Sequence, residues 1–331
     1  MIVLVTGATG FIGTHQVKEL AEAGHRVVGV DINPPHPAAE VFLQSVADRV
    51  EFARADISAR GALQRVIPES IDAVIHAAVI AVSSGLEVTN PVRVLDVNVV
   101  GTLEALRCAR QAGARRFVYI SSSGVYGRTD QEITITESHS LQLTNIYPVA
   151  KVTNERIVRW FATHEDVTTV SARIAAPYGP MERSTGTRRG MSPIHPLVHA
   201  AVEGRTIEIP DPQRARDWTH AGDTAYALRL LAEAPVLPHD CYNISCGTPV
   251  PLAGVADILV QLVPGFSWVP AEGEREVGGA VVERRGPMDI SRLRALGFAP
   301  RYTVEEGLRD TVMWVRRLRA AGIRMDGGTR A

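Results

Sequence analysis

Short apolar segments alternate with longer segments of helical periodicity along the first half of the chain. The apolar segments are short and mostly rich in Val, Ile and Ala, which favours strands at Ile2–Val5, Arg26–Val30, Val50–Ala55, Ala73–Ala77, Arg116–Ile120 and Thr168–Ile174. Helices are expected between them, at about Phe11–Ala23, Arg60–Val66, Asn90–Ala112 and Pro148–His164. This alternation predicts an α/β fold with a Rossmann-type, doubly wound parallel sheet, whose ligand lies beyond the carboxyl ends of the strands.

The segment from Thr6 to Gly13 carries the clearest chemical signal, because its glycines join the first strand to the first helix. Gly7 permits a tight turn, Gly10 lets backbone approach a diphosphate, and Gly13 lets the helix pack against the strand. The free N–H groups and positive dipole of such a helix end bind phosphate. The context therefore predicts a dinucleotide site.

Asp31 indicates which dinucleotide is bound. It ends the second apolar segment, where an acidic side chain can accept hydrogen bonds from both hydroxyls of the adenosine ribose. A 2′-phosphate beside Asp31 would meet like charge without an obvious arginine nearby, so the sequence favours NAD over NADP. We expect an NAD-binding domain over residues 1–177. Residues 178–331 should form mainly a smaller C-terminal α/β substrate lobe, with some chain returning to the first domain.

Composition narrows the class of protein. The chain has 331 residues, 45% of them hydrophobic, and a net charge of −1 with a pI near 6.8. This size supports a large core, and the balanced charge gives no basic footprint for nucleic acid or an anionic membrane. Arg188-Arg189 and Arg284-Arg285 could hold a phosphate locally. We expect a small-molecule substrate, with neither a nucleic acid nor a membrane as partner.

Cysteine and histidine spacing suggests no metal site. Cys108, Cys241 and Cys246 fit no zinc-binding spacing and are expected to be reduced thiols. His195 and His199 lack an accompanying carboxylate with ligand spacing. Because the first strand starts at the second residue and the apolar runs are short, we expect a cytoplasmic protein.

Tyr147 and Lys151 form a second candidate constellation. Their i, i+4 spacing places phenol and ammonium on one face at the start of a helix. An adjacent cation, joined by a positive nicotinamide ring, should lower the pKa of the phenol and prepare it to deprotonate a hydroxyl. The strand that ends at Ile120 delivers the hydroxyls of Ser121 to Ser123 to the same edge of the sheet.

With these motifs in order, the chain resembles the extended short-chain dehydrogenase/reductase family, in its NAD-dependent sugar epimerase/dehydratase branch, over nearly its full length. The resemblance is carried by Thr6 to Gly13, Asp31, Asp56-Ile57, His76 to Ala78, Asn98 to Thr102, Ser121 to Gly127, Tyr147 to Lys151, Arg173 to Pro180, and Arg216 to His220. It implies Ser122, Tyr147 and Lys151 as catalytic residues, and a homodimer built from the helices near Asn90–Ala112 and Pro148–His164.

The resemblance also implies two sets of binding residues. The cofactor set is Gly7, Thr9, Gly10, Phe11, Ile12, Gly13, Asp31, Asp56, Ile57, Ala77, Ala78, Val79, Asn98, Tyr147, Lys151 and Pro177. The substrate set is Ser83, Ser123, Tyr178, Arg216, Arg284 and Arg285. Within the first set, Asp56 and Ile57 would contact adenine, and Asn98 would support the active-site helix.

Departures from the family pattern bear on the reaction. Dehydratases of this branch have acidic residues where Ser123 and Gly124 stand here, which argues against dehydration. Ala176 replaces an Asn that commonly touches a nucleotide-sugar diphosphate, whereas Arg216 and either Arg284 or Arg285 match positions that grip it. The leading interpretation is C4 epimerisation of a UDP-sugar through a transient ketone. The alternatives are a net dehydrogenase or reductase of a free sugar, sugar acid or small hydroxy compound, and a non-catalytic NAD-sensing regulator.

Overall fold

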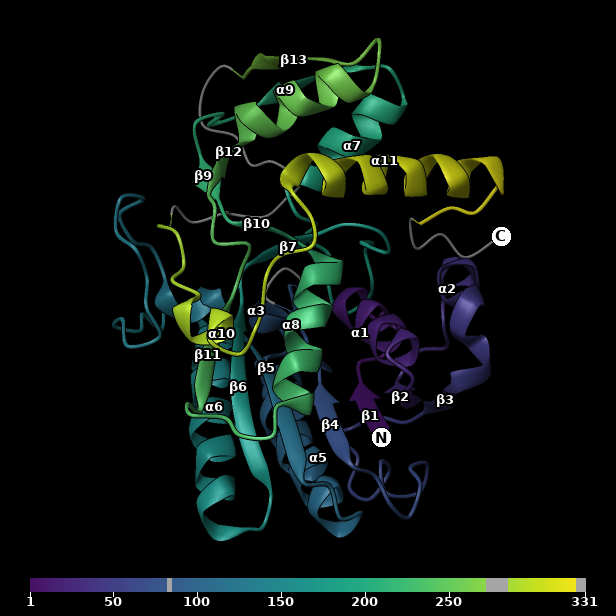
Figure 1. Cartoon of the computed structure of the whole chain (residues 1–331), viewed down its shortest axis with the longest axis vertical. Coiled ribbons are helices and arrows are strands. Elements are labelled where there is room, and N and C mark those ends of the chain that lie inside the picture. The colour runs from purple at the N-terminus through teal and green to yellow at the C-terminus, as the bar shows by residue number, and fades with distance from the viewer. Residues whose placement is uncertain (82–84, 272–284, 326–331) are drawn as a thin grey trace.

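The computed structural model describes residues 1–81, 85–271 and 285–325. Its centre is a seven-stranded parallel sheet in the order β11-β6-β5-β4-β1-β2-β3 (Figure 1). The strands are β1 (Ile2–Thr6), β2 (Arg26–Asp31), β3 (Val50–Arg54), β4 (Ala73–His76), β5 (Arg116–Ser122), β6 (Thr168–Ile174) and β11 (Cys241–Ile244). The order reverses between β1 and β4, which is the switch point where a doubly wound sheet binds its ligand.

Helices cover both faces of this sheet. Alternate residues of β1 point in opposite directions, so that Val3 and Val5 join one core and Leu4 joins the other. The first core also receives α1 (Phe11–Glu22), α2 (Pro37–Leu43) and α8 (Ala221–Glu233), and the second receives α5 (Gly101–Gln111) and α6 (Ile146–His164). Two apolar faces explain why the strands are nearly continuous hydrophobic runs.

The C-terminal lobe lies above the carboxyl edge of the sheet in Figure 1. Its helices are α7 (Ile194–Val202), α9 (Leu252–Leu262) and α11 (Val304–Ala320), which share a core around Trp218. Small sheets pair β7 (Ala176–Tyr178) with β10 (Trp218–His220), β9 (Ala215–Arg216) with β12 (Val250–Pro251), and β8 (Thr206–Ile209) with β13 (Ser267–Pro270). The short α10 (Ser291–Arg294) contacts β11. The chain thus returns to the main sheet through α8 and β11.

Two expected helices differ in the structure. Residues 60–66 form consecutive turns instead of a helix, because Gly61 has a left-handed φ of +68° that interrupts the helical ladder. The segment expected as one helix from Asn90 is divided into α4 (Pro91–Leu95), the π-helix η3 (Asp96–Val100) and α5. The remaining short helices within the described residues are η1 (Gln44–Arg49), α3 (Leu86–Thr89) and η4 (Ser123–Tyr126).

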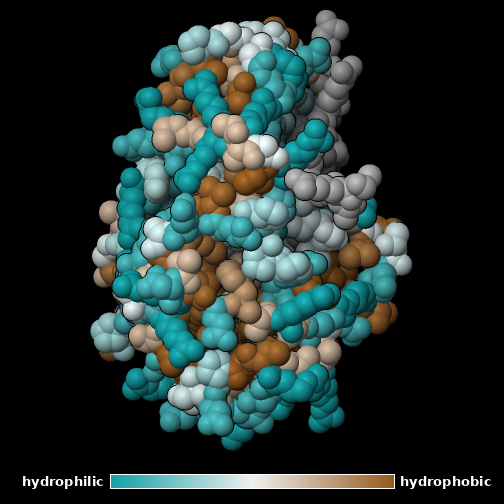
Figure 2. All heavy atoms as spheres, turned by 90° about the vertical axis from the view of Figure 1, so that its right-hand side faces the viewer, coloured by the Kyte–Doolittle hydropathy of each residue, from teal (hydrophilic) through white to brown (hydrophobic). Residues whose placement is uncertain are grey.

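Among the helices of residues 1–81, 85–271 and 285–325, none is both long and apolar enough to cross a bilayer. The face in Figure 2 is covered largely by hydrophilic side chains, with brown hydrophobic patches between them.

A substitution at Gly13 tests the close packing of α1 against the end of β1. A Cβ at this position would overlap the Gly7 carbonyl oxygen, which is rigid backbone. We expect Gly13→Ala to lower the melting temperature by several degrees, because overpacking costs about 1–3 kcal/mol. Gly186→Ala is the matched control, since a Cβ there meets nothing within 4 Å. Equal melting temperatures for the two variants, measured by circular dichroism, would contradict this account.

Candidate active site

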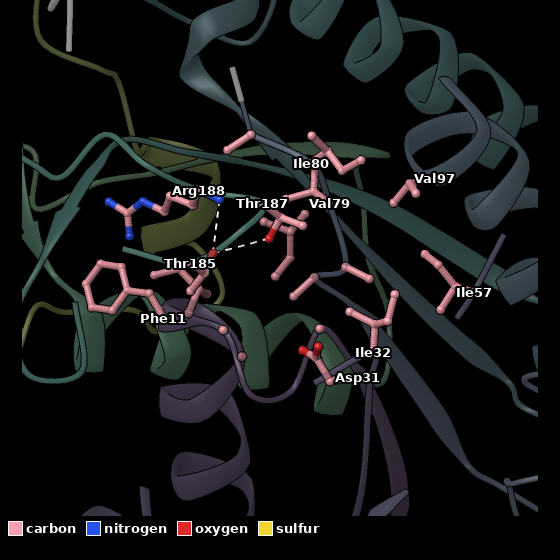
Figure 3. Close-up of a pocket in the computed structure, with 18 of the residues that line it drawn as sticks. Phe11, Asp31, Ile32, Ile57, Val79, Ile80, Val97, Thr185, Thr187 and Arg188 are labelled. Atoms are coloured by element: carbon pink, nitrogen blue, oxygen red, sulfur yellow. Dashed lines mark hydrogen bonds between the residues drawn. The ribbon is translucent and has the colours of Figure 1, made fainter. Parts of the chain in front are cut away.

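One large cleft opens at the carboxyl ends of β1, β2, β4 and β5. It encloses about 1540 Å³, counting its open mouth. Ser122, Tyr147 and Lys151 all line it. Most of the residues expected to bind the cofactor line it as well: Gly7, Gly10, Phe11, Ile12, Gly13, Asp31, Asp56, Ile57, Ala77, Ala78, Val79 and Pro177. Figure 3 shows several of these side chains around the open space.

The turn between β1 and α1 forms one wall of the cleft. Gly7 has a φ of +69°, and a Cβ on it would approach the Ala78 backbone nitrogen to 2.6 Å. Its own N–H donates to the Val30 carbonyl over 2.8 Å. Helix α1 begins after Gly10 without a side-chain cap, so its first N–H groups are available to an anion at this wall.

Asp31 lies at the end of β2, beside this turn. One carboxylate oxygen accepts the Thr9 N–H over 3.2 Å, and the other accepts the Asn33 N–H over 3.0 Å. The backbone of Thr9 therefore faces Asp31. Thr9 itself is only 4% exposed and does not line the cleft. Further along, Asp56 is paired with Arg93 at 2.6 Å, and both line the cleft.

The catalytic candidates meet at the junction of β5 and α6. The Ser122 hydroxyl oxygen accepts the Gly124 N–H over 3.0 Å, and this hydroxyl acts on the Tyr147 phenol by lowering its pKa. The Asn145 side chain caps α6 by accepting the Tyr147 N–H over 3.0 Å. Lys151 Nζ donates to the Ile120 carbonyl over 2.6 Å and lies 5.5 Å from the centre of the Tyr147 ring.

The protein's own groups do not produce the lowered tyrosine pKa that was expected from sequence. Burial raises the pKa of Tyr147, and the Ser122 hydroxyl and the charge of Arg188 only oppose this rise. Burial also lowers the pKa of Lys151 to about 7, against the opposing charge of Glu155. The expectation counted the neighbouring cation but not the cost of removing both groups from water.

A buried polar network supports the active-site helix. The Asn98 side chain accepts the Ile80 N–H over 2.8 Å and donates to the Ile80 carbonyl over 3.0 Å. The Asn98 carbonyl in turn accepts a hydrogen bond from Asn154 of α6. Asn98 therefore acts at the cleft through Ile80 and α6, because its own side chain does not line the space.

The predicted substrate residues are placed elsewhere. In β7, Pro177 lines the cleft, but the next side chain points the opposite way, and the Tyr178 hydroxyl donates to the Val304 carbonyl over 3.3 Å. Tyr178 is 1% exposed, so the structure does not bring it to the cleft. Arg216 lies in β9 of the C-terminal lobe and does not line the cleft either.

Ser123 and Arg285 contact each other beside the cleft. Arg285 donates to the Ser123 hydroxyl over 3.0 Å and to the Gly127 carbonyl over 2.8 Å, and it is 6% exposed. Neither side chain lines the cofactor cleft. Ser83 and Arg284, the other two predicted substrate residues, lie outside the described residues.

Sequence reasoning missed a segment that crosses the cleft. Residues 181–192, which we call the strap, place Arg183, Thr185, Thr187 and Arg188 in its lining. The Arg188 guanidinium lies 5.0 Å from the centre of the Phe11 ring (Figure 3). The Arg188-Arg189 pair in the sequence was the only signal, and it did not indicate which cleft the pair would face.

Arg183 corrects one premise of the cofactor prediction. Its guanidinium is buried beside the glycine turn and interacts electrostatically with Asp31. The sequence showed no arginine near Asp31 because the strap follows it by a long stretch of chain. The preference for NAD therefore depends on the Asp31 carboxylate, not on a lack of positive charge at this end of the cleft.

The family assignment follows from comparison with known proteins. The model of the NAD-dependent epimerase/dehydratase family matches residues 3–245. This chain belongs to that family. NAD is its cofactor, and the uncapped start of α1, the glycine turn and Asp31 fit that dinucleotide.

Relatives of the chain act on nucleotide sugars. The UDP-glucose 4-epimerase of Mycolicibacterium smegmatis is 31% identical over 322 residues, covering 96% of this chain and 99% of that protein. The dTDP-D-glucose 4,6-dehydratase of Mus musculus is 27% identical over 330 residues, covering 95% and 88%. The structure of MoeE5 with UDP-glucuronic acid and NAD has a TM-score of 0.79 at 30% identity and covers 96% and 99%. The family is therefore one of nucleotide-sugar epimerases and dehydratases.

The homodimer remains a prediction. Its two proposed helices carry exposed apolar side chains, among them Leu103 on α5 and Trp160 on α6. These side chains fit a helix-to-helix contact between copies, in which they would be buried.

The burial of Lys151 predicts a pH-dependent stability in protein freed of nucleotide. Its pKa falls from 10.5 to about 7 on folding. Below pH 7 both states hold the proton, and the folded state carries the full cost of a buried charge. Above pH 7 the folded state releases the proton while the unfolded state keeps it, so that cost declines up to about pH 10.5. We expect the melting temperature of the wild type, relative to Lys151→Met, to rise between pH 7 and 9. A constant difference in calorimetry would refute it.

Proposed function

We propose that the chain inverts C4 of a UDP-hexose or UDP-hexuronate, using NAD transiently. The observation that carries the proposal is the meeting of Ser122, Tyr147 and Lys151 in one cleft, with the ammonium of Lys151 5.5 Å from the centre of the Tyr147 ring. An isolated sensor domain would not need a hydroxyl, a phenol and an ammonium directed at the same space. Family membership and the nucleotide-sugar relatives support the substrate class.

The proposed roles follow from the contacts of each residue. Tyr147 accepts the proton of the substrate hydroxyl, and Ser122 hydrogen-bonds the same oxygen. Lys151 holds its ammonium between the Ile120 carbonyl and the phenol ring and favours the ionised phenol. NAD, when bound along the glycine turn and Asp31, supplies the hydride acceptor and later the donor. In an epimerase, the ketone turns over between these two transfers.

The residues after Ser122 argue against dehydration. Elimination of water from a sugar needs an acid and a base beyond the tyrosine. Here Gly124 has no side chain, and the Ser123 hydroxyl accepts a hydrogen bond from Arg285. The mouse relative therefore indicates the family and not the reaction of this chain.

A net dehydrogenase is the second candidate, and one residue favours it. By the resemblance to the family, Ala176 in β7 stands where an Asn commonly touches the substrate diphosphate, and alanine has no amide to donate. The engagement of Arg285 with Gly127 and Ser123 points the same way. Such an enzyme would act on a free sugar or sugar acid and release NADH.

Replacing the phenol tests the chemistry. We expect Tyr147→Phe to keep its affinity for NAD but to lower turnover by about two to four orders of magnitude, the usual contribution of a positioned acid–base group. Nucleotide titration and turnover of the same preparation provide the two readouts. A variant with turnover near that of the wild type would remove Tyr147 from the proposed mechanism.

Product analysis separates the two candidate functions. An epimerase holds its cofactor through a full cycle, so incubation with UDP-glucose, UDP-galactose or UDP-glucuronate should yield the C4 epimer without accumulation of NADH absorbance. Proton NMR identifies the epimer, and a thermal-shift assay with UDP reports the nucleotide site. Stoichiometric NADH from a free sugar, with no stabilisation by UDP, would establish the dehydrogenase instead.

A further inference from the structure

The strap is held by hydrogen bonds on both sides of the cofactor cleft. It starts after Pro180, whose carbonyl is hydrogen-bonded to His15 of α1 over 2.7 Å. The Thr187 carbonyl accepts the Ala81 N–H over 2.9 Å, across the cleft from α1. The strap therefore joins the glycine-turn side to the segment that follows β4.

Internal contacts fix the course of the strap. Glu182 is 4% exposed and accepts hydrogen bonds from the Ser192 N–H, the Ser192 hydroxyl and Arg188 at 2.6 to 2.7 Å. Met181 is fully buried with a φ of +67°, a conformation that a residue with a side chain adopts only at a cost. Burial of Met181 and the bonds to Glu182 offset that cost and hold the next residue, Arg183, in place.

Arg183 projects from the strap to the glycine turn. One terminal nitrogen, Nη2, donates to the Thr9 carbonyl over 2.8 Å. The other, Nη1, is buried and has no hydrogen-bond partner among the residues that the structure describes. Arg183 lines the cleft, and its charge interacts with Asp31 and with His36.

An unpartnered guanidinium nitrogen is costly in a folded protein unless a ligand satisfies it. The hydrogen bond from Arg183 to the Thr9 carbonyl anchors the turn, but it uses only the Nη2 nitrogen. The guanidinium reaches the Thr9 carbonyl in the turn before the uncapped start of α1, and its charge acts on Asp31. A diphosphate is expected at the start of α1 and the adenosine ribose at Asp31. Phosphate oxygens are strong acceptors for arginine at this position.

We propose that Arg183 is a further cofactor-binding residue, which donates through Nη1 to the ribose–diphosphate half of NAD from the substrate-lobe side of the cleft. Its charge also provides a partner for a 2′-phosphate once the Asp31 carboxylate is removed. The proposal rests on the cofactor of the family and not on the sugar that is turned over. It is therefore testable by nucleotide binding even if the epimerase proposal fails.

The first experiment measures dinucleotide affinity by calorimetric titration of the full chain with NAD and with ADP-ribose. Arg183→Met keeps the aliphatic stem and removes the donors, and we expect both ligands to bind about tenfold to a hundredfold more weakly. Arg189→Met, a neighbouring exposed strap arginine outside the cleft lining, should stay within twofold of the wild type. Affinity of Arg183→Met within twofold of the wild type for both ligands would overturn the proposal.

A purely structural role for Arg183 predicts a different result. If Arg183 only anchored the turn through its hydrogen bond to the Thr9 carbonyl, losing that bond would lower the melting temperature. A lysine, which restores only the charge, would then not restore the affinity for NAD. If Arg183→Met does not fold, Arg183→Lys replaces it, because lysine keeps the charge with a different donor geometry. We expect Arg183→Lys to bind NAD at least several-fold more weakly than the wild type, and more tightly than Arg183→Met where that variant folds. Wild-type affinity in Arg183→Lys would contradict a guanidinium-specific contact.

The second experiment uses NADP as the probe. Asp31→Asn should raise NADP affinity relative to NAD, since it removes a repulsive charge and a ribose acceptor. In the double variant Asp31→Asn with Arg183→Met, we expect most of that gain to disappear. A gain of equal size in the double variant would show that Arg183 does not face the 2′-position, and would overturn that part of the proposal.

Discussion

The close approach of α1 to the end of β1 is the constraint on which the cofactor cleft depends. A Cβ on Gly13 would overlap the Gly7 carbonyl, and a Cβ on Gly7 would meet the backbone of Ala78. Three backbone segments can converge here only because both positions lack side chains. Their convergence leaves the first N–H groups of α1 uncapped at the cleft wall. The packing requirement and the anion-binding property therefore have one origin.

The opposite wall depends on buried amides. The π-helix η3 contains Asn98, whose carbonyl accepts a hydrogen bond from Asn154 of α6, while its side chain holds both backbone groups of Ile80. His76 adds to this layer through Thr6 and Thr102. Burial lowers the pKa of His76 to about 3, so its ring is neutral and serves as a structural hydrogen-bonding group. Cofactor wall and catalytic helix thus share one support, which couples the position of Tyr147 to that of the bound dinucleotide.

Sequence reasoning succeeded where the information is local. The strand Thr168–Ile174 has the predicted bounds, and the first helix ends one residue before its predicted end, because hydrophobic period determines both. The helix expected around Gly61 failed because propensity did not reveal its left-handed φ. Tyr178 was misplaced because alternation along β7 turns it away from the side that Pro177 faces. Arg183 escaped notice because it meets Thr9 across 174 residues of chain. Contacts of that range come from tertiary packing, which no local motif records.

The charges around Lys151 and Tyr147 explain why ionisation of the phenol depends on a ligand in the cleft. Behind Lys151, Glu155 accepts hydrogen bonds from Ser121 over 2.6 Å and from buried Arg173 over 2.7 Å. Because Arg173 satisfies much of this carboxylate, Glu155 offsets the burial of Lys151 only in part, and the pKa of Lys151 falls to about 7. Burial meanwhile raises the pKa of Tyr147. The side chains alone therefore favour a neutral phenol, and additional positive charge must come from what binds in the cleft.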